Sequence, residues 1–167
     1  MWVRSEYAGE LAVLLTWLSA FLPWNVTYSS GIGRGALLFV RFPLVQIRYS
    51  FDVPLARSVA VADPLSAIAF QRGQSIELAY QAWAVGAAVF VVALVVSVLY
   101  YHDESWAESW AVDPVRLLGG LLFATGVGFA VATYLLLTRG FPGVPIPIGV
   151  VFLLLFGGLL LIVDRTE

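Results

Sequence analysis

The closest group of side chains that could bind a metal is His102, Asp103, Glu104 and Glu108. One imidazole together with carboxylates can hold a divalent cation. The spacing of these four residues fixes no coordination number, and acidic residues in a connector usually form a solvated face. We therefore expect no metal site, and no paired carboxylates or Ser-His-Asp arrangement for hydrolysis can be recognised.

Glu10 is the one acidic residue within a long apolar segment, which runs from Ala8 to Trp24. Carboxylates inside a membrane are functional candidates because burying their charge is costly. Glu10 lies in the first turns of its expected helix, near the headgroups and the positive end of the helix dipole. The favoured interpretation is an interfacial Glu10, and the alternative is a functional intramembrane acid.

Missing residue types exclude several kinds of chemistry. The chain has no cysteine, so disulfides, thiolate zinc sites and catalytic thiols are excluded. All nine basic residues are arginine, which excludes a lysine Schiff base and a Walker A lysine. A single histidine cannot form a bis-histidine haem site. We expect no cofactor, and the net charge of −2 gives no sign of a nucleic-acid partner.

Residues 25–75 form the one long segment that is not uniformly apolar, and five arginines lie in it: Arg34, Arg41, Arg48, Arg57 and Arg72. Val, Ile, Phe and Tyr between residues 36 and 51 predict one or two strands, interrupted at Pro43. The seven-residue spacing of the first three arginines would instead suit a helix lying on the membrane surface. Pro43 makes that helix the less favoured alternative.

The pair Asp63-Pro64 predicts the start of a short helix over residues 64–72, since aspartate caps helices and proline suits their first turn. Gly73 can end this helix. The pair Asp113-Pro114 predicts another helix start in the same way. Three prolines between residues 142 and 147 cannot continue a helix, so residues 140–147 are predicted to be a linker.

Long apolar segments predict that the chain lies in a membrane. Its residues are 60% hydrophobic and only 12% charged, and its mean hydropathy is +0.90, far from the values of soluble domains. We predict an all-α membrane protein with four transmembrane helices. Residues 1–24 would hold the first helix, 25–75 an Arg-rich extramembrane subdomain with short strands and a short helix, and 76–167 helices near 76–101, 114–138 and 148–163.

The expected location is the plasma membrane, with both termini on one side. Six arginines would then share a side with the loop 25–75, which favours a cytoplasmic loop. The triplet Asn25-Val26-Thr27 is a glycosylation sequon and would matter only if the loop were outside. A cleaved signal peptide is the alternative interpretation of the first apolar segment, although Ser19-Ala20-Phe21 is a poor cleavage site.

Small residues recur every fourth position on two of the expected helices. Such positions share one helix face and let another backbone approach closely. We predict that these faces contact other helices, within the chain or in a partner: Gly120, Ala124, Gly128 and Ala132 on one helix, and Ala8, Ala12, Thr16 and Ala20 on the other.

Four segments carry a resemblance to a known family: the opening Trp2-Val-Arg-Ser-Glu-Tyr-Ala-Gly-Glu10, the pair Pro23-Trp24, the stretch Arg41-Phe-Pro43 and the linker from Gly140 to Pro147. Over its full length the chain resembles a small family of multi-pass membrane proteins from halophilic archaea. The resemblance implies no activity and carries over no site residue.

From these observations we expect a non-catalytic membrane subunit or scaffold. It would pack against membrane lipid and against other membrane proteins, or itself, through its small-residue faces. Its Arg-rich loop would meet a cytoplasmic partner or anionic headgroups. The alternative is a transporter or channel component for a small solute.

Overall fold

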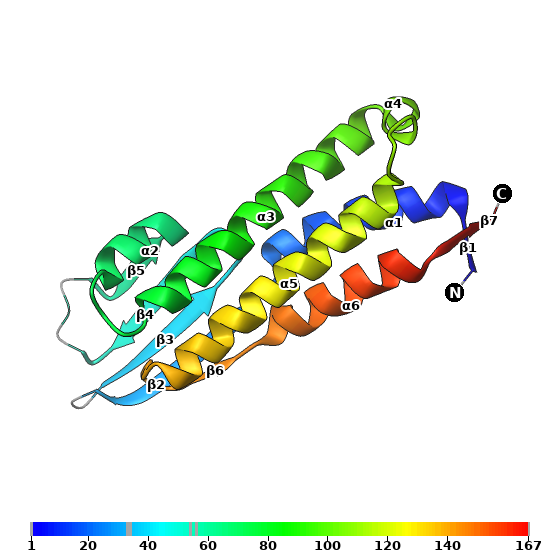
Figure 1. Ribbon diagram of the computed structural model, residues 1–167. Helices are drawn as coiled ribbons and strands as arrows, with labels where there is room; N and C mark the ends of the chain where they lie inside the picture. Colours follow the sequence, from blue (N-terminus) through cyan, green and yellow to red (C-terminus); the bar gives the residue numbers. More distant parts are fainter. Residues whose placement is uncertain (1, 33–34, 54, 56, 167) are drawn as a thin grey trace.

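The computed structural model describes residues 2–32, 35–53, 55 and 57–166, and it joins a helix bundle to an antiparallel sheet (Figure 1). The helices are α1 (Ser5–Phe21), α2 (Pro64–Gln71), α3 (Glu77–His102), α4 (Glu104–Glu108), α5 (Pro114–Thr138) and α6 (Ile148–Ile162). The strands are β1 (Trp2–Arg4), β2 (Asn25–Ile32), β3 (Gly35–Arg41), β4 (Gln46–Phe51), β5 (Val59–Ala62), β6 (Val144–Ile146) and β7 (Asp164–Thr166).

The prediction of an all-α protein with four transmembrane helices is wrong. Among the described residues, only α3 and α5 are both long and apolar enough to cross a bilayer. Helix α1 has 17 residues and α6 has 15. At about 1.5 Å per residue, α6 extends roughly 22 Å, against a hydrocarbon core of roughly 30 Å. Pro147 precedes α6 and strand β7 follows it, so neither end lengthens the helix.

A five-stranded sheet also departs from the predicted all-α fold. Its strand order is β5-β4-β3-β2-β6, and every neighbouring pair is antiparallel. The surface helix weighed for residues 34–48 is not formed, because Arg41 ends β3 and Arg48 lies in β4. Pro43 lies in the tight turn between these strands, where Phe42 N donates to Val45 O at 2.8 Å. Proline suits such a turn because it cannot donate to a strand ladder.

Strand β6 comes from the linker that precedes α6. It pairs with β2 in the register Val26↔Ile146 and Tyr28↔Val144. Gly143, just before β6, has φ +91°, and a Cβ there would lie 2.5 Å from Tyr28 O. Only glycine combines this left-handed backbone with so close an approach. The linker therefore completes the sheet as its edge strand.

Helix α5 lies at the centre of the bundle, between α3 and α6 (Figure 1). A Cβ on Gly128 would lie 3.2 Å from the Cα of Gly86 on α3. Toward α6, a Cβ on Gly119 would lie 3.1 Å from Gly157 O. Paired glycines thus let α5 approach both neighbours closely, as is typical of tightly packed apolar helices.

The sheet is fixed to one end of the bundle, far from the paired termini (Figure 1). Trp24, which precedes β2, stacks on Phe129 of α5 with ring centroids 4.9 Å apart. Trp83 Nε1 of α3 donates to Pro43 O at 2.9 Å. Gly149 N at the start of α6 donates to Pro23 O at 3.0 Å. Three bundle helices therefore anchor the sheet.

Helix α2 covers the β5 side of the sheet, beside the start of α3. Asp63 caps it, accepting from Leu65 N at 2.9 Å and Ser66 N at 3.0 Å. Hydrogen bonds from the side chain and backbone of Ser66 lower the pKa of the Asp63 carboxyl below its ordinary value. The cap is therefore charged at neutral pH, which suits the positive end of the helix dipole.

Candidate functional site

One face of the sheet points toward α2 and the start of α3, and we call it the inner face. Side chains alternate along strands, so cross-strand partners share a face. Arg41 pairs with Gln46, and Phe39 pairs with Arg48. On β5, Ala62 lies opposite Gln46 and Ala60 opposite Arg48. The inner-face residues of β3, β4 and β5 therefore include Leu37, Phe39, Arg41, Gln46, Arg48, Ala60 and Ala62.

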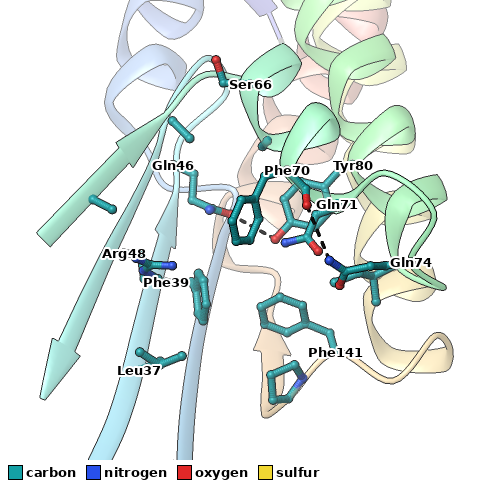
Figure 2. A pocket seen from close by; sticks show the side chains of 15 residues that line it. Leu37, Phe39, Gln46, Arg48, Ser66, Phe70, Gln71, Gln74, Tyr80 and Phe141 are labelled. Carbon is teal, nitrogen blue, oxygen red and sulfur yellow. Dashed lines mark hydrogen bonds between the residues drawn. The ribbon is translucent and has the colours of Figure 1, made fainter. Parts of the chain in front are cut away.

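A cavity of about 470 Å³ lies between the inner face, α2, the start of α3 and the loop that follows α5. Its sheet side includes Phe39, Arg48, Ala60 and Ala62. The two alanines are small, which leaves space that larger side chains would fill. The opposite side is formed by Ser66, Ala67, Phe70, Gln71, Gln74, Ile76, Tyr80, Phe141 and Pro142. Figure 2 shows these walls facing each other across the cavity.

Two polar groups in the cavity wall are buried without a partner. Arg48 Nε on β4 and Gln71 Oε1 on α2 make no hydrogen bond in the part of the chain that the structure describes. Leaving such a buried group unsatisfied costs about 1–3 kcal/mol. Arg48 Nε is a cationic donor and Gln71 Oε1 is a neutral acceptor. The cavity lies between β4 and α2, which carry them (Figure 2). A bound molecule could satisfy both.

Arg41 lies directly behind the cavity wall, with 1% of its surface exposed. Its guanidinium donates to four neutral oxygens: Gln46 Oε1 at 2.8 Å, Asn25 Oδ1 at 2.9 Å, Thr27 Oγ1 at 3.0 Å and Tyr80 OH at 3.3 Å. Tyr80 and Gln46 also line the cavity. The network therefore connects the buried cation to the cavity wall.

Aromatic rings surround the same guanidinium. Its Cζ lies 4.6 Å from the ring centroid of Phe141, 5.0 Å from that of Phe39 and 5.8 Å from that of Tyr80, distances at which rings attract a cation. Burial lowers the pKa of Arg41, and Tyr80 partly offsets this effect. Arginine nevertheless keeps its proton at neutral pH. A full positive charge therefore lies behind the aromatic wall.

The cavity wall carries no negative charge to balance these cations. No aspartate or glutamate is among the described residues that line it. Neither Arg41 nor Arg48 forms an ion pair with a carboxylate in the described ranges. The acids at the start of α2 and of α3 have other partners: Asp63 caps α2, and Glu77 accepts from Gly73 N at 2.6 Å. The cavity is therefore electropositive and otherwise largely apolar.

The arginines of residues 25–75 do not form one cluster in the structure. Arg41 and Arg48 come together at the inner face, one behind the cavity wall and one in it. Arg57 is exposed before β5, and Arg72 is exposed at the end of α2. Arg34 lies outside the described residues.

The acidic candidates lie away from the cavity. Glu10 is exposed on α1. In the connector after α3, Asp103 caps α4 by accepting from Trp106 N at 2.9 Å, and Tyr100 OH donates to Glu104 Oε1 at 3.0 Å. His102 is exposed at the end of α3. The described residues contain no group of three or more metal-ligating side chains.

The small-residue face of α5 is divided. Ala132 is fully buried, and Gly128 approaches α3. Ala124 is exposed, and a Cβ on Gly120 would have nothing within 4 Å. On α1 the corresponding positions face the bundle, and the first three are almost fully buried: Ala8, Ala12 and Thr16, followed by the half-buried Ala20.

Sequence reasoning did not identify most of the polar and aromatic residues of the site, and Gln46, Gln71, Tyr80 and Phe141 are four of them. Each lies on a different element, and no sequence spacing connects them. The alternation of side chains along β3 and β4 could have placed Arg41 and Arg48 on one face. It could not have indicated that α2 and Phe141 close the cavity over them.

Comparisons with known proteins assign no activity to this site. Residues 1–165 match a protein family described as a family of unknown function (DUF7549). No curated protein matches the chain.

Proposed function

Because the chain belongs to this family of unknown function, we propose its function from the structure: it is a non-catalytic membrane protein that binds a small amphipathic molecule at the membrane surface. The observation that carries the proposal is the cavity of about 470 Å³ at the end of the apolar bundle. Its walls combine rings with unpartnered polar groups, which is typical of ligand sites.

The outer surface of the bundle supports a position in lipid. Large apolar side chains are exposed along the helices, including Val92 at 51%, Val127 at 45% and Leu155 at 55%. No charged residue occurs between Leu78 and Tyr101 of α3. Contiguous exposed apolar surface of this kind is rare on soluble monomers. In a bilayer the same side chains would meet lipid tails, with α3 and α5 crossing.

The position of the cavity follows from that placement. Tyr80 in the first turn of α3 and Ile76, which caps this helix, line the cavity where α3 would enter the bilayer. The cavity would then lie at the level of the lipid headgroups. Phe70, 71% exposed on α2, would lie at its rim. An amphiphile could enter from the membrane without crossing water.

A binding role suits the cavity better than catalysis. General acid–base catalysis needs a group that titrates near the working pH, most often histidine or a carboxylate. The described lining residues include neither. This supports the subunit or scaffold expected from the sequence, with the cavity as its ligand site. We also propose that the sheet lies on the cytoplasmic side of the membrane. The resemblance further suggests that the family consists of membrane proteins from halophilic archaea.

Filling the cavity tests the proposal. Ala62→Leu would place three more carbons in the space above β5 without adding charge. We expect the variant, purified in mild detergent, to retain at least ten-fold less co-purified amphiphile than the unmodified protein, as measured by native mass spectrometry. Its melting temperature should be unchanged or slightly higher, since filling a cavity commonly stabilises a protein.

Val61→Leu is the matched control, because Val61 is 65% exposed on the opposite face of the same strand. It should retain the amphiphile at the level of the unmodified protein. Equal retention in Ala62→Leu and Val61→Leu would show that the cavity is not the binding site.

A further inference from the structure

We propose that the ligand of the cavity is an anionic amphiphile whose carboxylate or phosphate group binds Arg48 while its apolar chain lies against the aromatic rings. This inference rests on the proposed function and names the chemical class of its ligand. It follows from the charges, the unpartnered atoms and the rings of the cavity wall.

Arg48 is the residue that would hold the anion. Its Nε is buried without a partner, and the guanidinium points into the cavity from β4 (Figure 2). A planar guanidinium binds carboxylate or phosphate oxygens through two parallel hydrogen bonds. In contrast to Arg41, whose donors are taken by four side-chain oxygens, Arg48 has no hydrogen-bond partner among the described residues.

The electrostatic environment favours an anion over a neutral or cationic group. The described lining residues contain no carboxylate, and the buried Arg41 adds a second positive charge behind Phe39 and Tyr80. Opposite charges attract more strongly in a partly buried site than in water. A cationic ligand would meet two positive charges and no carboxylate among the described lining residues.

Gln71 indicates a second feature of the ligand. Its Oε1 is buried, lines the cavity and lacks a donor among the described residues. An amide oxygen accepts hydrogen bonds. The ligand should therefore carry a hydroxyl or an N–H near its anionic group, as a glycerol phosphate does.

The remaining walls suit an apolar chain. Leu37, Phe39, Ile76 and Phe141 line the cavity, and Phe70 lies exposed at its rim. A free phosphate ion would leave these surfaces unused. A soluble phosphate and a lipid headgroup both carry an anionic group that Arg48 could bind. The apolar walls favour the lipid.

Three probes distinguish these sources in an equilibrium binding assay on the delipidated full chain in nonionic detergent. Palmitoyl-glycerol phosphate carries anion, hydroxyl and chain. Monopalmitoyl-glycerol has the same chain with a second hydroxyl in place of the phosphate, and inorganic phosphate lacks the chain. We expect the first probe to bind at least ten-fold more tightly than either of the others.

Arg48→Gln should remove that preference and reduce affinity for palmitoyl-glycerol phosphate at least ten-fold, with little effect on monopalmitoyl-glycerol. Arg57→Gln is the charge-matched control, because Arg57 is exposed and does not line the cavity. It should bind all three probes as the unmodified chain does.

Two results would overturn the inference while leaving the proposed function intact: equal affinity for the anionic and neutral amphiphiles, or unchanged anion preference in Arg48→Gln. Inorganic phosphate binding as tightly as the amphiphile would overturn the assignment of an apolar chain. Failure of every amphiphile to bind would instead contradict the proposed function itself.

Discussion

Arg41→Leu is expected to lower the free energy of unfolding by about 3–5 kcal/mol, because four buried side-chain oxygens lose a charged donor and each buried polar group left unsatisfied costs about 1–3 kcal/mol. Asn25, Thr27, Gln46 and Tyr80 would each lose the hydrogen bond that the guanidinium donates. For a chain of this size, such a loss corresponds to a melting temperature lower by roughly 6–20 °C. Tryptophan fluorescence during heating in mild detergent measures it.

Arg48→Leu is the comparison, since both arginines lie on the inner face and leucine replaces the same side chain. Arg48 Nε has no partner to lose. Its removal should leave the melting temperature unchanged or raise it, because an unsatisfied buried polar group is removed. An Arg48→Leu protein that is destabilised as strongly as Arg41→Leu would contradict the division of the two arginines into structural and ligand-binding residues.

Gly157→Ala is expected to destabilise the bundle by about 3 kcal/mol, the upper part of the range for overpacking. The added Cβ would lie 2.5 Å from Phe123 N and 2.8 Å from Gly119 O. Both are backbone atoms of α5, so no side chain can rotate away and the two helices must separate. The melting temperature in detergent should fall by roughly 6–12 °C.

Gly158→Ala controls for the change in helix propensity. A Cβ on Gly158 has nothing within 4 Å, and alanine favours a helix over glycine by about 1 kcal/mol. This variant should be as stable as the unmodified chain or slightly more stable. Equal behaviour of the two variants would show that α5 and α6 do not approach at Gly157.

The helices that follow the sheet were predictable because their ends depend on local chemistry. Asp63 and Asp113 cap α2 and α5, each followed by a proline in the first turn. No charged residue interrupts α3 between Glu77 and His102. These signals lie within a few residues of the helix ends, so the sequence alone contains them.

The sheet was underestimated because its pairing is not local. The Val, Ile, Phe and Tyr content indicated one or two strands between residues 36 and 51, yet β6 joins the sheet from residues 144–146 through pairing with β2. Nothing near Val144 specifies a partner more than a hundred residues away in the chain. Proline-rich sequence indicated only a linker, although Pro145 is compatible with an edge strand.

The small-residue pattern identified a close-packing helix but not all of its contacts. Helix α5 has neighbours on two sides, so Gly128 meets α3 and Gly119 meets α6. A four-residue spacing places residues on one face and does not state which face is covered. Gly120 illustrates this limit, because the space beside it is open in the described structure.

If the bundle lies in the bilayer with the cavity at its surface, the exposed side chain of Val92 on α3 lies among lipid tails. The native chain has no cysteine, so single spin labels can be placed at Val92 on α3 and at Leu65 on α2, both exposed side chains. In lipid nanodiscs, electron paramagnetic resonance compares the access of oxygen with that of a water-soluble nickel chelate. We predict that the Val92 label is reached by oxygen and not by the chelate, whereas the Leu65 label is reached by the chelate. Equal access of the chelate to both labels would show that the bundle does not lie in the bilayer.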